Sequence, residues 1–259
     1  MESHSKLNYI ISDYMVMAGR CIRHITRNID NLITVIILPV ILMLLFVFVF
    51  GGAIDTGGDG SYINYVVPGI LLTCIGFSAS TTAVSINTDL TQGIVARFRS
   101  MPIARSSFIT GHVIASIFKN LISSTIAILV ALLIGFRPEA TFTGWLMIIL
   151  ILLLFALAIT YLSAVFGLLA KTPEGAGSFG FVILFLPYLS SAFVPIETMP
   201  SALRIFAEHQ PITVIIEALR PLLANAPSVN PLWAMIWCIG IIVASAFLAG
   251  QLFRRKVSS

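Results

Sequence analysis

One stretch of this sequence, residues 87–112, combines charges and apolar side chains in a pattern suited to recognition, and it lies between two long apolar runs. Its charged side chains are Arg97, Arg99, Arg105 and Asp89. The apolar side chains between them have helical spacing and share one face of a short helix; they are Ile94, Val95, Phe98 and Met101. Pro102 ends that helix, because proline lacks a backbone N–H and disfavours the helical conformation of the residue before it. The pattern indicates either a docking element for a cytoplasmic partner or a positively charged loop that only sets membrane topology.

The composition identifies the class of protein that carries this stretch. The chain has 259 residues, of which 58% are hydrophobic and 10% charged, and its mean hydropathy is +1.01. Soluble domains carry roughly 25% charged residues. Because so few charges cannot cover a water-facing surface, we expect a polytopic membrane protein. The net charge of +4 does not indicate a nucleic-acid partner, because the basic residues lie in loops rather than on one folded face.

The cysteines and the N-terminus offer no competing signal. Cys21, Cys74 and Cys238 share no metal-like spacing, and we interpret them as small apolar core residues. Residues 1–30 carry early cations and lack an early apolar core, so we expect no cleavable signal peptide.

Residues 1–30 also show a helical pattern, in which apolar residues from Tyr9 to Ile25 recur opposite the cations. The pattern is typical of an amphipathic helix in the cytoplasmic interface, with its cations facing anionic headgroups. The alternative is a plain N-terminal extension.

The remaining apolar runs predict an all-α fold with six membrane spans in a single transmembrane domain, residues 1–259. A run of about 19 residues extends roughly 29 Å as a helix, which is enough to cross the hydrocarbon. The predicted spans are 32–50, 62–86, 108–135, 145–170, 176–193 and 232–252. The predicted connections of interest are a cytoplasmic coupling loop, 87–107, and an outer hairpin, 194–231.

The outer hairpin is too polar and too interrupted by proline for a span, yet too apolar for a free loop. It predicts two short amphipathic helices, about 199–208 and 211–223, with Pro200 and Pro211 near their starts. Such a pair fits a re-entrant or interfacial hairpin before the last span.

Three charged residues near or within apolar elements need partners. Lys119 is either an intramembrane functional charge or a side chain that extends to the inner interface, and its nearness to the cytoplasmic end favours the second. Glu217 and Arg220 have i,i+3 spacing, which is suited to an ion pair.

The distribution of cations orients the spans, because positive charge is enriched in cytoplasmic loops. One side of the predicted topology holds Lys6, Arg20, Arg23, Arg27, Arg97, Arg99, Arg105, Lys171, Arg254, Arg255 and Lys256. The other side holds Arg137, Arg204 and Arg220. We therefore expect both termini to be cytoplasmic.

Two motifs resemble a known family. The loop NTDLTQGIVARFRSMPIAR resembles the cytoplasmic loop of type-2 ATP-binding-cassette (ABC) exporter permeases, and it is most similar to that of daunorubicin-resistance-type (multidrug) permeases. The matching positions are Asp89, Gly93, Arg97 to Met101, Pro102 and Arg105. The loop departs from the family where many members have Glu-x-x-Gly, because this chain has Asp89 and Gln92 before Gly93. The stretch before the last span resembles the family's outer signature through Phe193, Pro195, Met199, Pro200, Pro211, Thr213 and Arg220.

The resemblance covers essentially the whole chain and implies the membrane half of an exporter in a bacterial plasma membrane. It implies two copies of this permease, or one with a close paralogue, among membrane lipids and with two copies of a cytoplasmic ATPase subunit. Residues 90–102 would be the coupling helix in a cleft of that ATPase, and the N-terminal helix would also contact it. The residues that the resemblance assigns to coupling are Asp89, Gln92, Gly93, Arg97, Phe98, Met101 and Pro102.

The resemblance also bears on the chemistry. The chain has no Gly-x-x-x-x-Gly-Lys-Ser/Thr motif, so we expect no enzyme activity or cofactor in it, with ATP and Mg²⁺ bound by the partner ATPase. The expected substrates are hydrophobic or amphiphilic drug-like compounds. The alternative is a lipid, a glycolipid or a cell-wall polysaccharide precursor, because family members also move these.

Four other classes fit the sequence less well. An intramembrane enzyme or an ion-coupled carrier needs carboxylates, bases or metal ligands in the membrane, and the predicted spans hold no Asp or Glu. A passive channel or a membrane scaffold leaves residues 87–112 unexplained.

Overall fold

The computed structural model of the protein describes residues 15–23, 29–54, 61–93, 106–226 and 230–258. Every regular element in these ranges is helical, which confirms the predicted all-α class. Residues 15–23 form a short helix. The long helices are α2 (Ile29–Leu44, continued by the π-helical turn η1, Leu45–Phe50), α3 (Tyr62–Thr91), α5 (Ser106–Leu133), α6 (Phe142–Leu169) and α10 (Leu232–Ser258). The shorter helices are α7 (Pro173–Phe185), η2 (Leu186–Leu189), η3 (Ile196–Thr198), α8 (Ser201–His209) and α9 (Pro211–Leu223).

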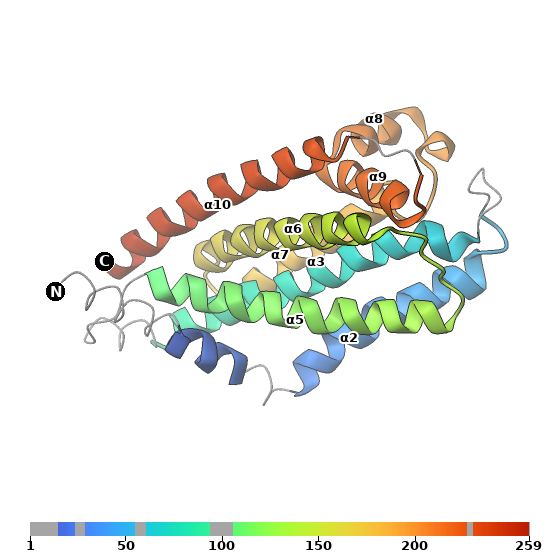
Figure 1. Cartoon of the computed structure of the whole chain (residues 1–259). Helices are drawn as coiled ribbons and strands as arrows, with labels where there is room; N and C mark the ends of the chain where they lie inside the picture. Colours follow the sequence, from blue (N-terminus) through green and yellow to red (C-terminus); the bar gives the residue numbers. More distant parts are fainter. Residues whose placement is uncertain (1–14, 24–28, 55–60, 94–105, 227–229, 259) are drawn as a thin grey trace.

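The long helices run side by side as a bundle with two distinct ends (Figure 1). Helices α8 and α9 lie at one end, which we call the hairpin end. The opposite end holds residues 15–23, the last turn of α3 and the last turns of α10, and we call it the terminal end. Five helices of the described part are long and apolar enough to cross a membrane: Ile33–Phe50, Tyr62–Thr91, Ser107–Leu133, Phe142–Leu169 and Leu232–Lys256.

The predicted fifth span, 176–193, differs most from the structure. Its helix, α7, begins at Pro173, where the Thr172 side chain accepts a hydrogen bond from the Gly175 N–H, and ends at Phe185. Pro187 explains the early end, because it has no N–H to continue the helical ladder, and the chain proceeds as the 3₁₀ turn η2. The predicted second span also differs, because α3 extends to Thr91 and takes in the first residues of the predicted coupling loop.

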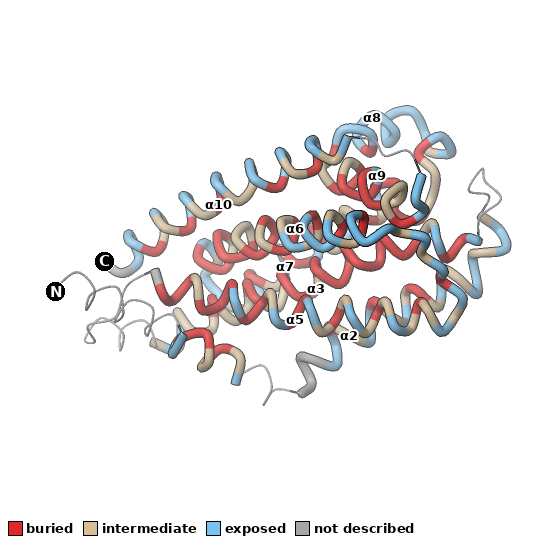
Figure 2. Tube along the Cα trace, viewed as in Figure 1, coloured by how far each residue is buried: buried red, intermediate tan, exposed pale blue. Residues whose placement is uncertain are grey.

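Helix α3 is the centre of the bundle, where it packs against α2, α5, α6 and α7 (Figure 2). In the most apolar 18-residue segment of each helix, 72% of residues are buried in α3, against 22% in α10 and 17% in α2 and its continuation η1. Glycine permits a close backbone approach to α3: a Cβ added to Gly167 of α6 would lie 2.6 Å from the Ala83 carbonyl oxygen. The small residues of α3 therefore allow its neighbours to come into backbone contact.

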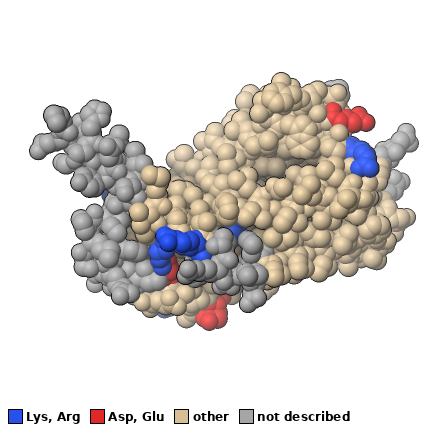
Figure 3. All heavy atoms as spheres, turned by 60° about the horizontal axis from the view of Figure 1, so that its bottom comes forward, with Lys and Arg blue, Asp and Glu red and all other residues tan. Residues whose placement is uncertain are grey.

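The outer surface of the bundle is largely apolar. Helix α10 exposes large hydrophobic side chains along its length, among them Trp233, Ile236, Trp237, Ile239, Val243 and Phe247. On the face in Figure 3, the charged side chains of the described residues gather toward the two ends, with an uncharged region between them. This distribution is typical of a protein that lies across a bilayer.

Candidate functional site

Three charged or titratable side chains meet at the terminal end, where the predicted coupling loop begins. Arg20 donates two hydrogen bonds to Asp89, from Nη1 to Oδ2 (3.2 Å) and from Nη2 to Oδ1 (3.3 Å). His112 Nε2 lies 3.2 Å from Asp89 Oδ2. The side chains of His112 and Asp89 are 7% and 15% exposed, and that of Arg20 is 36% exposed. We call Arg20, Asp89 and His112 the Asp89 junction.

The junction joins three segments that are distant in the sequence. Asp89 lies near the end of α3, His112 lies in the second turn of α5, and Arg20 belongs to the helix 15–23. An apolar contact supports the charged one, because Met17 is 2% exposed and a Cβ added to Gly111 of α5 would lie 3.1 Å from the Met17 Cβ. The predicted N-terminal amphipathic helix is thus seated on the bundle in its described part, through the apolar face that the sequence indicated.

The structure gives Asp89 a different setting from the loop position that the sequence suggested. Asp89 is helical, and its carboxylate contacts Arg20 and His112 of the same chain. Gln92 is exposed after the last turn, and Gly93 has φ +71°, a left-handed conformation that glycine adopts without steric cost. The other predicted coupling residues, Arg97, Phe98, Met101 and Pro102, lie outside the described residues. Of the three junction residues, Asp89 therefore lies directly before the predicted coupling helix in the chain.

The position of Lys119 in the structure contradicts the prediction made for its side chain. The sequence favoured an extension of its side chain to the interface, but the residue is 6% exposed and lies between α5 and α3. Its ammonium donates to Thr81 Oγ1 (2.7 Å), Thr82 Oγ1 (3.3 Å) and the Ser78 carbonyl oxygen (3.3 Å). The prediction was wrong because it rested on the nearness of Lys119 to the cytoplasmic end, whereas α3 presents three oxygens to the ammonium. The run of hydroxyl residues from 78 to 85 was the available signal.

Other polar contacts fix the ends of neighbouring helices at the same end of the bundle. Asn87 Nδ2 donates to the carbonyl oxygens of Gly167 (3.0 Å) and Ala170 (2.7 Å), which lie where α6 ends and have no later helical donors.

Asn120 is 4% exposed, and no hydrogen bond is found for its amide within the described part of the chain. Nor do the described residues include a group of three or more His, Cys, Asp or Glu arranged to hold a metal ion.

At the hairpin end, Arg220 is the central polar residue. Its guanidinium carbon lies 3.5 Å from the centre of the Tyr65 ring, and its Nε donates to the Tyr65 carbonyl oxygen (3.3 Å). It also donates to the Ser191 carbonyl oxygen. The predicted ion pair with Glu217 is not among the ion pairs of the described residues, because these contacts direct the guanidinium toward α3. Burial raises the pKa of the Glu217 carboxyl and lowers the pKa of Arg220.

The remaining outer-motif residues lie at helix starts. Pro195 precedes η3, Pro200 precedes α8, and Pro211 is the first residue of α9. Met199 lies between η3 and α8. Proline suits these positions because the first turn of a helix does not use its N–H groups within the helix. The exposed face of α8 carries an ion pair, Arg204 Nε to Glu208 Oε1 (2.7 Å), and this hydrogen bond raises the pKa of Arg204.

Comparison with known proteins shows the family of this chain. The family model described as "ABC-2 type transporter" matches residues 12–223, which include the Asp89 junction and Arg220. The chain belongs to the ABC-2 type transporter family. The family resemblance predicted from the two motifs is thereby confirmed.

Curated relatives agree with the family model. This ABC-2 permease is 26% identical over 231 residues to the daunorubicin resistance ABC transporter permease protein DrrB1 of Streptomyces coeruleorubidus, covering 87% of this chain and 80% of that protein. It is 22% identical over 254 residues to the probable doxorubicin resistance ABC transporter permease protein DrrC of Mycobacterium tuberculosis, covering 98% and 92%. Membership establishes a transmembrane transporter subunit and implies an ABC ATPase partner.

Proposed function

We propose that this permease exports hydrophobic or amphiphilic drug-like compounds by alternating access, with energy from a separate ATPase subunit. The observation that carries the proposal is the family match over residues 12–223, together with relatives named for daunorubicin and doxorubicin resistance that match over 80% and 92% of their own length. The buried centre around α3 and the apolar outer surface are consistent with a subunit that works within the bilayer.

The proposed orientation places the terminal end in the cytoplasm of a bacterial cell, with both chain termini on that side. Described cations are concentrated there: Arg20, Arg23, Lys171, Arg254, Arg255 and Lys256. The hairpin end has Arg137, Arg204 and Arg220. Positive charge favours the cytoplasmic side of a membrane protein, and both curated relatives come from bacteria.

The proposed coupling route begins at residues 90–102, seated in a cleft of the ATPase, which binds ATP and Mg²⁺. The assembly contains two ATPase subunits and two permeases, either two copies of this chain or one with a close paralogue. The Asp89 junction supports this route, because it ties the helix 15–23 and α5 to the end of α3. A displacement of the loop would therefore reach α3, α5 and the N-terminal helix together.

The test is co-expression of this chain with the ATPase encoded beside its gene, followed by purification, mass measurement and assays of ATP turnover and doxorubicin uptake into inside-out vesicles. We expect two copies of each subunit, vanadate-sensitive hydrolysis and ATP-dependent uptake. The double variant Arg97→Ala, Phe98→Ala should retain folding and separate hydrolysis from uptake. Arg137→Ala, which removes a cation at the hairpin end, is the matched control and should retain both.

Each other result has a definite meaning. Failure of a well-folded chain to retain any ATPase would overturn the exporter proposal in favour of a channel or a scaffold. A complex that hydrolyses ATP but takes up no drug would overturn the substrate class and favour a lipid, a glycolipid or a cell-wall polysaccharide precursor. Unchanged uptake in the double variant would overturn the assigned coupling route.

A further inference from the structure

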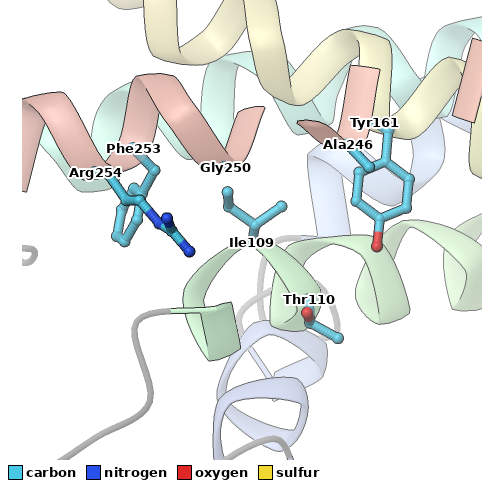
Figure 4. Close-up of a pocket in the computed structure, with 7 residues that line it drawn as sticks. All are labelled: Ile109, Thr110, Tyr161, Ala246, Gly250, Phe253 and Arg254. Carbon is cyan, nitrogen blue, oxygen red and sulfur yellow. The ribbon is translucent and has the colours of Figure 1, made fainter. Parts of the chain in front are cut away.

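A cavity of about 610 Å³ lies between α5, α6 and α10 near the terminal end (Figure 4). Its volume is within the range of roughly 300–1,000 Å³ that is typical of ligand sites. Phe253 of α10 stacks on Phe108 of α5 with their ring centroids 5.1 Å apart, so the two helices touch beside the cavity. Gly250, one turn before Arg254 on α10, leaves space, because a Cβ added there meets no atom within 4 Å.

The lining of the cavity combines apolar side chains with two hydroxyl groups, and it is positive at one end. Tyr161 of α6 and Thr110 of α5 contribute hydroxyl groups, and Arg254 of α10 contributes a guanidinium. In Figure 4 the Arg254 side chain extends from α10 toward α5, and the Tyr161 hydroxyl points toward the same helix. The described residues that line the cavity include no acid, and Asp89 is engaged by Arg20 and His112. The cavity thus matches a molecule with one anionic end and an apolar body.

The neighbouring surface indicates where such a molecule comes from. On α10, Val243 is 64% exposed and Phe247 is 65% exposed, so the helix that bounds the cavity carries an uncovered apolar face that suits contact with acyl chains. Arg254 is exposed near the end of the span, at the depth where a lipid phosphate lies if the terminal end faces the cytoplasm. Basic pockets between transmembrane helices on the cytoplasmic side bind the headgroups of anionic lipids.

We propose that this cavity binds one anionic phospholipid of the cytoplasmic leaflet, with the phosphate at Arg254 and an acyl chain along Gly250 and Phe253. The site rests on the orientation in the proposed function and not on transport. A free phosphate leaves the apolar length of the cavity unfilled, and a cationic amphiphile is repelled by Arg254. The bound lipid would bridge α10 and α5 beside the Asp89 junction.

The experiment is native mass spectrometry of the delipidated full-length permease, titrated with dioleoylphosphatidylglycerol, dioleoylphosphatidylcholine or glycerol 3-phosphate. We expect one phosphatidylglycerol per chain to bind at least fivefold more tightly than phosphatidylcholine, and glycerol 3-phosphate to bind weakly. Arg254→Gln should weaken phosphatidylglycerol binding about fivefold, because one cation near an anionic headgroup contributes about that much. Arg255→Gln removes the same charge from a residue that does not line the cavity and should change the affinity less than twofold.

A second pair of variants tests the cavity without changing charge. Gly250→Leu fills the cavity and should abolish tight binding of phosphatidylglycerol. Gly240→Leu adds the same side chain to the same helix, also in open space, and should leave phosphatidylglycerol binding unchanged. Equal affinity for both lipids, or equal losses in Arg254→Gln and Arg255→Gln, would overturn the proposal. Glycerol 3-phosphate binding as tightly as phosphatidylglycerol would instead show a free-anion site. The assay needs no ATPase, so failure of the lipid site and failure of the exporter proposal are separate results.

Discussion

Removal of the Arg20–Asp89 contact is the sharpest test of how the N-terminal helix is attached to the bundle. We consider Arg20→Gln, Asp89→Asn and the double variant as a thermodynamic cycle. Each single change removes one charge of a two-hydrogen-bond pair and keeps a polar side chain of similar shape. If the pair acts as a unit, the second change should cost little once the first has been made.

The contribution of the Arg20–Asp89 pair to the free energy of unfolding follows from its two hydrogen-bond distances and from the exposed fraction of Arg20. At 3.2–3.3 Å, unit charges in a medium of effective dielectric constant about 20 attract by roughly 5 kcal/mol. Arg20 is 36% exposed, so screening and side-chain ordering reduce the net value to about 1.5 kcal/mol. For a chain of this size, that loss lowers the melting temperature by about 3–6 °C.

The assay is thermal unfolding of the purified permease in one detergent, with the ATPase–permease complex measured in parallel for coupling of hydrolysis to transport. Each single variant should melt about 3–6 °C below the parent, and the double variant no lower than Asp89→Asn. The matched control is Arg23→Gln, because Arg23 donates to the Gly19 carbonyl oxygen of its own helix rather than to Asp89. We expect its melting temperature to fall by less than that of Arg20→Gln.

Additive losses in the double variant would refute the reasoning, because they would show that the two side chains stabilise the protein independently. A loss in Arg23→Gln as large as that in Arg20→Gln would also refute it. In that case the helix would be held by its general positive charge rather than by the contact with Asp89.

Three further variants test the packing and the buried charges. Gly167→Ala should lower stability by about 1–3 kcal/mol, because its Cβ would lie 2.6 Å from the Ala83 carbonyl oxygen, whereas Gly240→Ala should have no such effect in thermal unfolding. Lys119→Met should change stability by less than about 1 kcal/mol, because the loss of three hydrogen bonds is offset by removal of a buried charge; a loss several times larger would show that the ammonium is a structural requirement. Arg220→Lys should weaken the hairpin end by about 1–2 kcal/mol, because lysine lacks the planar group that stacks on the Tyr65 ring, and faster proteolysis within α8 and α9 would report it.

Much of the fold follows from local patterns along the chain. Runs of apolar residues indicated the helices that are long enough to cross a membrane, because length and hydropathy are properties of a continuous segment. The prolines of the outer hairpin predicted helices at 199–208 and 211–223, and the structure has α8 at Ser201–His209 and α9 at Pro211–Leu223. The end of α7 was missed although Pro187 was visible, because proline inside an apolar run is compatible with a kinked span as well as with a helix end.

The composition by itself determined the class of protein, and the spacing of two motifs indicated its family. Only the tertiary structure decided which polar groups meet. Asp89 and Arg20 are 69 positions apart, and Lys119 reaches hydroxyls 37 and 38 positions away. The physical reason is that helical periodicity assigns a residue to a face, whereas the partner of that face depends on how α3, α5 and the helix 15–23 pack. A buried charge is stabilised by the partners that packing brings to it, and the sequence does not show these partners side by side.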